Sequence, residues 1–233
     1  LREHGLGIVY IGLESGNEAL LEKFCKGVTA EETVVNAIRC KEAGIATSVT
    51  AINGMAGANG DWRAHAIDTA KAVSRMKPDY IAFLTLRVYS GTPLHDWIER
   101  GEFQMMNPAE LMTETRLFLE HIDSEGSVFR SNHASNYLPL GGTLNRDREA
   151  LIQTIDAALD GKVLFLPCGV RQRDSQLIET YIARDVYIVE HETLLQSGVL
   201  ADGVLDLTAE AVGPEYPGRA YEDLTAADWV LAA

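Results

Sequence analysis

Short, uninterrupted apolar stretches alternate with helix-like segments over residues 1–160, and this alternation limits the fold more than any other feature. Residues 7–13 (GIVYIGL) form a continuous run rich in β-branched side chains, which is typical of a strand buried on both faces. Strands are also predicted at 46–52, 80–86 and 127–131. Strands that alternate with helices at roughly 30 to 40 residues per unit predict a parallel βαβ architecture of the α/β class.

Capping residues mark the helices between these strands. Thr29, with Glu32 three positions later, predicts a capping box that opens a helix, and Gly44 stands where a C-cap glycine belongs. Asn107 and Pro108 supply an N-cap and a first-turn proline for a later helix. Helices are also predicted at 18–25, 61–76 and 146–159, with a short amphipathic piece around Trp97.

The number of predicted strands indicates part of a barrel. Four are too few to close an eight-stranded barrel, which takes ~250 residues. They would leave two sheet edges and an apolar inner face uncovered. Because the sequence starts at Leu1 rather than at Met, we expect residues 1–160 to be the C-terminal half of a parallel (β/α) partial TIM-like barrel, with the first half upstream.

Residues 161–233 are expected to form an acidic, mixed C-terminal extension of unknown role. From Arg171 to the end the chain has four basic and twelve acidic residues, so these 63 residues hold more than half of the net charge of −14. A strand is predicted at 163–166 and a helix at 174–183. A solvated extension is the default interpretation, and a partner-binding role stays open.

Charge and cysteine content narrow the functional classes. The chain has 20 Lys and Arg residues against 34 Asp and Glu, which disfavours binding to nucleic acid and to anionic membranes. No apolar run approaches the roughly 20 residues that a membrane span needs. Cys25, Cys40 and Cys168 are too widely spaced for a zinc pattern and too few for a disulfide framework. We therefore expect reduced thiols in a cytoplasmic protein.

Polar residues follow the predicted strands, at the edge where parallel α/β proteins place their working residues. Glu14 and Ser15 follow the first strand and are suited to hold the two hydroxyls of a ribose. The alternative is that Ser15 or Asn17 caps the next helix and Glu14 is a solvated turn residue. Asn53 and Gly54 open a glycine-rich loop after the second strand, where the backbone can approach a flat ligand. Its spacing does not match a phosphate-binding loop.

The later strand ends are polar as well. Arg87 follows the third strand, and the fourth leads into the sequence RSNHASNY at 130–137. Arg87, Asn132, His133 and Asn136 are candidates to line a substrate pocket or to form a hydrogen-bonded loop that closes the barrel end, and His133 is a candidate general base. The nucleophile motif G-x-S-x-G and the metal motif H-E-x-x-H are both absent.

Several segments together resemble the radical S-adenosylmethionine (radical SAM) family. They are similar to its fourth, fifth and sixth strand units and to a loop in one of its branches: YIGLESG at 10–16 with KGVT at 26–29, KEAGI at 41–45 with ING at 52–54, GTPL at 91–94, and SNHASNYLPL at 131–140 with GTL at 142–144. The resemblance spans roughly residues 1–160.

The resemblance implies a fold, cofactors and a reaction. In that family a partial (β/α) barrel holds a [4Fe-4S] cluster on three cysteines, and reductive cleavage of S-adenosylmethionine yields a 5′-deoxyadenosyl radical that abstracts hydrogen from the substrate. By position, Glu14 and Ser15 would contact the ribose. Asn53 and Gly54 would lie beside the adenosine, and the loop around Asn132, His133 and Asn136 would face the substrate or close the barrel. The implied protein is an oxidoreductase that needs an electron donor and acts on a small-molecule or unknown substrate.

The chain departs from the family at the cluster. It has no C-x-x-x-C-x-x-C motif, and Cys25 and Cys40 fall on predicted helices with the wrong spacing. Of the family's G-x-I-x-G-x-x-E pattern, only Ile52 and Gly54 are kept. We therefore expect the cluster ligands to lie upstream of Leu1 and this chain alone to be inactive.

Two other interpretations stay open. One is a non-catalytic half barrel that serves as an interaction or scaffold module, with the acidic extension as its contact surface. The other is an ordinary (β/α) barrel enzyme such as an aldolase. That chemistry needs a lysine at a strand end to form a Schiff base, and none is visible there.

Overall fold

The structure is a computed structural model that describes residues 1–133 and 135–160. The chain divides into two compact units, one made of Leu1–Ser131 and Leu140–Ile152, the other of Asn132–Pro139 and the residues from Gln153 on. The strand predicted at 163–166, the helix at 174–183, Cys168 and the acidic extension lie outside the described residues, and the domain boundary expected at residue 160 stays a prediction.

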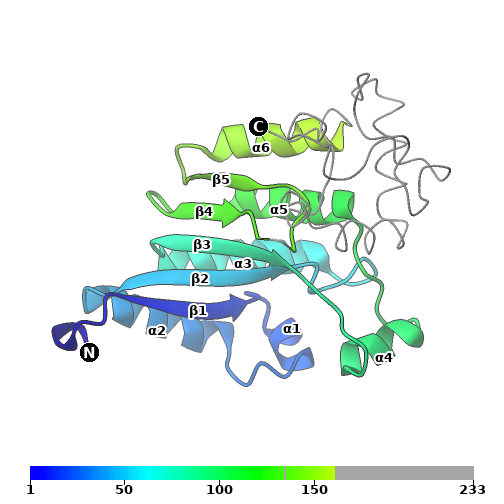
Figure 1. The fold of residues 1–233 in the computed structure, drawn as a ribbon, viewed down its shortest axis with the longest axis horizontal. Helices are drawn as coiled ribbons and strands as arrows, with labels where there is room; N and C mark the ends of the chain where they lie inside the picture. The colour runs from blue at the N-terminus through cyan, green and yellow to red at the C-terminus, as the bar shows by residue number, and fades with distance from the viewer. Residues whose placement is uncertain (134, 161–233) are drawn as a thin grey trace, which may run out of the picture. The chain divides into compact units, whose positions relative to one another are not determined.

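The first unit contains a five-stranded sheet whose strands lie in chain order (Figure 1). Its strands are β1 (Ile8–Glu14), β2 (Ala46–Asn53), β3 (Tyr80–Thr85), β4 (Val128–Ser131) and β5 (Leu140–Thr143). The first four are parallel, and β5 runs antiparallel to β4. This confirms the α/β class and the predicted strands, with ends shifted by one residue at most. Within the described residues the sheet is open, because β1 pairs only with β2 and β5 only with β4.

The helices begin where the capping residues predict. They are α1 (Glu18–Lys23), α2 (Ala30–Glu42), α3 (Trp62–Met76), α4 (Pro93–Glu99), α5 (Pro108–His121) and α6 (Arg148–Leu159), with a short 3₁₀ turn at Arg2–His4. The capping box of Thr29 and Glu32 is present, and Gly44 has a φ of +73° after α2. Asn107 caps α5 in a second capping box. None of the described helices combines the length and apolarity needed to cross a bilayer.

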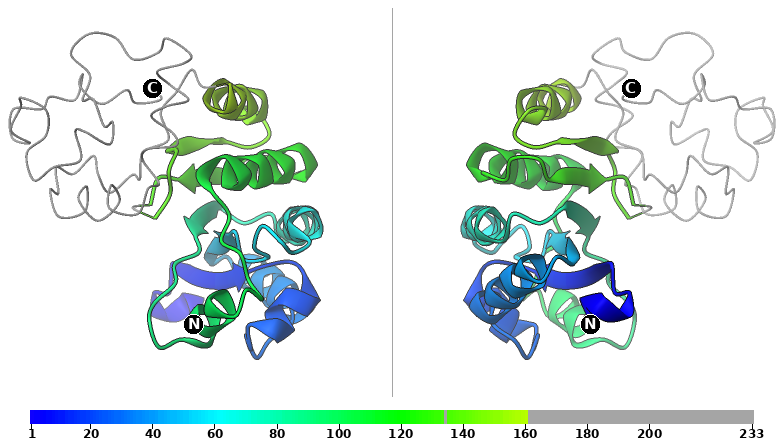
Figure 2. Two further views of the ribbon diagram at one scale, coloured as in Figure 1. Left: turned by 90° about the vertical axis from the view of Figure 1, so that its right-hand side faces the viewer. Right: turned by 90° about the vertical axis from the view of Figure 1, so that its left-hand side faces the viewer.

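Helices α2, α3 and α5 all lie on one face of the sheet (Figure 2). Val49, Ile81 and Phe129 occupy one row of neighbouring strands and are buried. Phe83 packs on Phe118 of α5 with ring centroids 4.5 Å apart, and on Phe129 at 5.3 Å. Because side chains alternate between the faces of a strand, these odd-numbered positions form the core between sheet and helices.

The opposite face of the sheet carries the even-numbered side chains. Tyr10, Ser48 and Tyr80 are register partners on β1, β2 and β3. Tyr10 is 79% exposed and Tyr80 45% exposed, although both stand on strands of the sheet. The three helices that bury the core face therefore leave the rings of Tyr10 and Tyr80 exposed to solvent.

Candidate functional site

The strand ends that the sequence singled out meet at one edge of the first unit. β1, β2 and β3 are parallel and in register, so that Glu14 lies beside Ala51 and Asn53 beside Thr85. Their carboxyl ends therefore point the same way, as expected of a parallel sheet.

At the end of β1, the Glu14 side chain folds back over its own strand. The pairing register shifts between Gly12 and Glu14, and Glu14 has a φ of +62°. A Cβ placed on Gly12 would overlap Glu14 Oε1 and would lie 3.1 Å from Lys26 Nζ. Lys26 Nζ donates to Glu14 Oε1 at 3.0 Å, with side chains 27% and 23% exposed. The result is a partly exposed carboxylate that is anchored through one oxygen.

The residues after Glu14 hold the strand end against α3. Ser15 is fully buried, and its Oγ accepts the Asn17 N–H at 2.9 Å. The Gly16 N–H donates to Thr69 Oγ1 of α3 at 2.9 Å, and a Cβ on Gly16 would overlap the Asp68 backbone. Asn17 is the N-cap of α1, as the structural alternative expected. The contact of Ser15 with a ribose stays a prediction.

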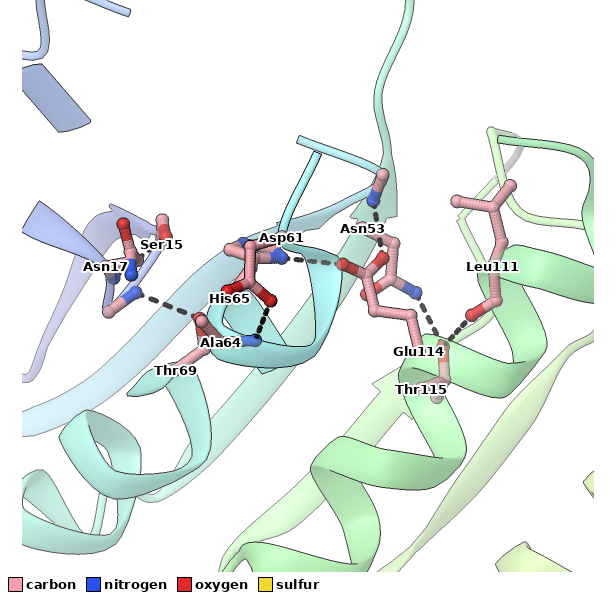
Figure 3. Close-up of polar contacts among 12 residues, drawn as sticks. Ser15, Asn17, Asn53, Asp61, Ala64, His65, Thr69, Leu111, Glu114 and Thr115 are labelled. Atoms are coloured by element: carbon pink, nitrogen blue, oxygen red, sulfur yellow. Dashed lines mark hydrogen bonds and ion pairs between the residues drawn. The ribbon is translucent and has the colours of Figure 1, made fainter. Parts of the chain in front are cut away.

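The end of β2 is held by side chains from two helices (Figure 3). Asn53 is buried and donates through Nδ2 to Thr115 Oγ1 of α5 at 2.7 Å. The next residue, Gly54, has a φ of +81° and donates its N–H to Glu114 Oε2 at 2.6 Å. Glu114 Oε1 lies 2.6 Å from His65 Nδ1 of α3. The Glu114 and His65 side chains are 1% and 3% exposed.

His65 and Glu114 were not among the predicted site residues. They stand 49 positions apart on two different helices, whereas the predicted site residues all follow predicted strands. A signal was nevertheless present at Glu114, which lies three residues after Leu111 and four before Phe118. A carboxylate on the apolar stripe of an amphipathic helix must be buried, and buried carboxylates have partners.

The loops after the three strands are tied to one another. Ala58 N–H donates to the Gln104 carbonyl at 2.8 Å, and Gln104 N–H donates to Asn59 Oδ1 at 3.0 Å. These contacts join the loop after β2 to the segment after α4. Phe24, just past α1, meets Trp97 of α4 edge to face at 5.7 Å. The strand-end edge is therefore preorganised rather than made of separate loops.

The remaining predicted residues follow β3 and β4. Arg87 is half-buried, two residues past the end of β3. Asn132, His133 and Asn136 belong to the second unit. There His133 Nδ1 accepts the Ser135 N–H at 3.1 Å, and the Asn136 N–H donates to the His133 carbonyl at 2.9 Å. These bonds describe a hydrogen-bonded loop, and the role of His133 as a base stays a prediction.

The described residues do not fit a [4Fe-4S] cluster. Residues 1–133 and 135–160 contain no group of three His, Cys, Asp or Glu side chains able to hold a metal ion. Their cysteines are Cys25, exposed after α1, and Cys40 on α2, both free thiols. Because a cluster needs several thiolates, its ligands would have to come from outside these residues.

The polar groups at this edge are a carboxylate and amides rather than thiolates. The Glu14 carboxylate has two acceptor oxygens, one of which is bonded to Lys26. The amide of Asn53 and the N–H of Gly54 are already bonded to α5, so these residues shape the edge.

A separate cavity of about 580 Å³ lies between α1 and the start of α2. Two of its acidic side chains are hydrogen-bonded to the backbone: the Glu18 carboxylate accepts the Ala30 N–H at 3.0 Å, and the Glu32 carboxylate accepts the Thr29 N–H. This cavity contains none of the predicted site residues.

Neither a scan of protein-family models nor a search of curated proteins found a match to this chain. The radical SAM assignment therefore stays a prediction that rests on the segments quoted above.

Proposed function

We propose that this chain is part of a radical SAM enzyme and supplies the edge that binds the nucleoside of S-adenosylmethionine. The observation that carries the proposal is the Glu14 carboxylate at the end of β1, held by Lys26 over Gly12 and partly open to solvent.

The order of the strands supports a partial barrel rather than a doubly wound sheet. In a (β/α) barrel each strand lies beside the next in chain order and all helices lie outside. A doubly wound sheet reverses its strand order and carries helices on both faces. Here β1 to β4 lie in chain order, with α2, α3 and α5 on one face. In this proposal the open face is the inner wall of a barrel that further strands would complete.

The chemistry of Glu14 suits a ribose. A carboxylate accepts hydrogen bonds through two oxygens, and adjacent hydroxyls supply two donors. Lys26 bonds Oε1, and within the described residues it is the only hydrogen-bond partner of that side chain. Oε2 therefore remains for a sugar hydroxyl, while Lys26 keeps the carboxylate oriented.

The reaction itself belongs to the cofactors. In radical SAM enzymes the cluster supplies the electron that cleaves S-adenosylmethionine. The proposal therefore requires thiolates and an electron donor from outside the described residues, and it assigns this chain the task of binding and orienting the nucleoside.

Binding of S-adenosylhomocysteine, which needs no cluster or electron, tests the proposal. We expect calorimetric titration to show binding by the 233-residue chain and about a ten-fold or greater loss in Glu14→Gln, because a charged acceptor is replaced by a neutral one. Glu22→Gln, which alters an exposed carboxylate on α1, is the matched control and should bind like the wild type. Equal affinity of both variants, or no binding by the wild type, would contradict the proposal.

A non-catalytic interaction module is the second candidate, and the exposed aromatic rings favour it. Tyr10 and Tyr80 flank Ser48 in one row on the open face. Exposed apolar patches often mark interaction surfaces. A chain that does not bind S-adenosylhomocysteine but does associate through this face would support the module.

A further inference from the structure

A buried hydrogen-bonded network that includes His65 and Glu114 lies next to the end of β2. Glu114 of α5 accepts the Gly54 N–H through Oε2 and faces His65 Nδ1 through Oε1, both at 2.6 Å. We assign the proton to Nδ1, since an ionised carboxylate can only accept. Within the described residues the buried His65 Nε2 has no hydrogen-bond partner.

Such a network is not what packing alone would favour. Removing a carboxylate from water is unfavourable unless several donors replace the lost hydration. Apolar side chains of similar volume often stabilise a core as well as a buried charged pair does. The His65–Glu114 pair also leaves one buried ring nitrogen unpaired. The presence of this pair therefore points to a task other than holding α3 on α5.

The contacts of α5 show what that task is. Leu111, Glu114 and Thr115 lie on one face of the helix, at spacings of three and four residues. Thr115 bonds Asn53, Glu114 bonds Gly54, and a Cβ on Gly54 would lie 2.8 Å from Leu111 Cδ2. One helix face thus sets the direction in which the chain leaves β2 and enters the loop at 54–60.

We propose that His65 and Glu114 are positioning residues of the nucleoside-binding edge. His65 holds the Glu114 carboxylate, Glu114 fixes the Gly54 amide, and the loop at 54–60 is thereby held in the conformation on which the adenosine lies. This inference rests on the proposed function, but its first step concerns the free chain and is tested without ligand.

Hydrogen exchange of the loop at 54–60, followed by mass spectrometry at one temperature below every melting midpoint, gives the ligand-free test. We expect Glu114→Gln and His65→Leu to speed exchange of this loop. We also expect them to weaken binding of S-adenosylhomocysteine about ten-fold, since the loop would have to be ordered on binding. In His65→Asn, the amide Nδ2 can replace the ring Nδ1 as a donor. This variant should therefore keep most of the slow exchange of the loop and most of the affinity for S-adenosylhomocysteine.

Val73→Ala is the matched control. Val73 is fully buried on the same helix, two turns beyond His65, and contributes no polar group. We expect this variant to lower the melting temperature while loop exchange and affinity stay at wild-type values. If Glu114→Gln and His65→Leu behave like Val73→Ala, the positioning role is overturned.

The outcomes separate the two proposals. If the wild-type chain does not bind S-adenosylhomocysteine, the proposed function fails, and loop exchange still decides whether the pair orders the loop. If no variant folds, the resonance and the exchange rate of the Gly54 amide proton in the wild-type chain test whether this amide is bonded to Glu114. A low-field resonance with slow exchange supports the bond to Glu114, and a random-coil shift with fast exchange overturns it.

Discussion

At the end of β1, a glycine makes room for a charged side chain. Gly12 lies where a Cβ would overlap the Glu14 carboxylate, so its missing side chain lets that carboxylate reach Lys26 across the strand. The sequence predicted that Glu14 follows an apolar strand. The fold-back could not be predicted, because it depends on a left-handed φ at Glu14 and on a lysine twelve residues away.

Gly12→Ala should therefore weaken ligand binding more than it destabilises the fold. We expect the new methyl group to displace Glu14 from Lys26, so that affinity for S-adenosylhomocysteine falls about ten-fold, as for loss of a charged hydrogen bond. The free energy of unfolding should change by less than about 1 kcal/mol, because partly exposed ion pairs contribute little.

Gly7→Ala is the control for the same change on the same segment. A Cβ there meets nothing within 4 Å. Titration calorimetry and urea unfolding of both variants check the prediction. Similar affinities for Gly12→Ala and Gly7→Ala would show that Glu14 does not depend on Gly12.

The helices and strands that carry a sequence pattern of their own, such as capping residues, could be predicted. The capping box opens α2, and Asn107 with Pro108 opens α5, because a cap is a contact between residues three positions apart. β5 was missed because the four residues LGGT carry no strand pattern. It forms by pairing with β4, where Gly141 makes room for the Arg130 side chain.

The capping box of α2 should make stability depend on pH in one direction. The Glu32 carboxylate accepts the Thr29 N–H at 2.9 Å, and this bond holds the pKa of Glu32 below its ordinary value of 4.5. A carboxyl whose folded pKa is lowered contributes stability above its unfolded pKa and loses it as the pH falls through the folded value. Wild type should therefore exceed Glu32→Gln in stability at pH 7, and this difference should shrink as the pH falls from 4.5 through the lower folded pKa.

Urea unfolding from pH 7 to pH 3 measures this difference. Glu42→Gln at the opposite end of α2 is the control, because a negative charge near a helix C-terminus is unfavourable. We expect that variant to be neutral or slightly more stable at pH 7. A Glu32→Gln variant with the same free energy of unfolding as the wild type at every pH would contradict the role given to the capping box.

In the molecule as a whole, the main feature is that helices α2, α3 and α5 cover one face of the sheet and not the other (Figure 2). The sequence indicated parallel strands too few to close a barrel, and the described residues form an open sheet with helices α2, α3 and α5 on one face. The relation between His65 and Glu114 could not be foreseen, since it arises only when α3 and α5 lie side by side.

The open face should make the 233-residue chain self-associate. Tyr10 and Tyr80 are exposed on the same row of the sheet, and among residues 1–133 and 135–160 no strand pairs with the outer edge of β1. We expect sedimentation velocity to show association that increases with concentration and is weakened by Tyr10→Lys. Tyr89→Lys, which alters a 69% exposed ring in the loop after β3, is the control. A wild-type chain that stays monomeric at all concentrations would contradict the half-barrel account.

The most direct test of the radical SAM assignment is reductive cleavage of S-adenosylmethionine. The measurement uses the full open reading frame that contains these residues, reconstituted anaerobically with iron and sulfide. We expect about four irons per chain, as for one [4Fe-4S] cluster. We also expect release of 5′-deoxyadenosine, and less of it in Glu14→Gln at limiting S-adenosylmethionine. A protein that assembles no cluster and releases no 5′-deoxyadenosine would contradict it.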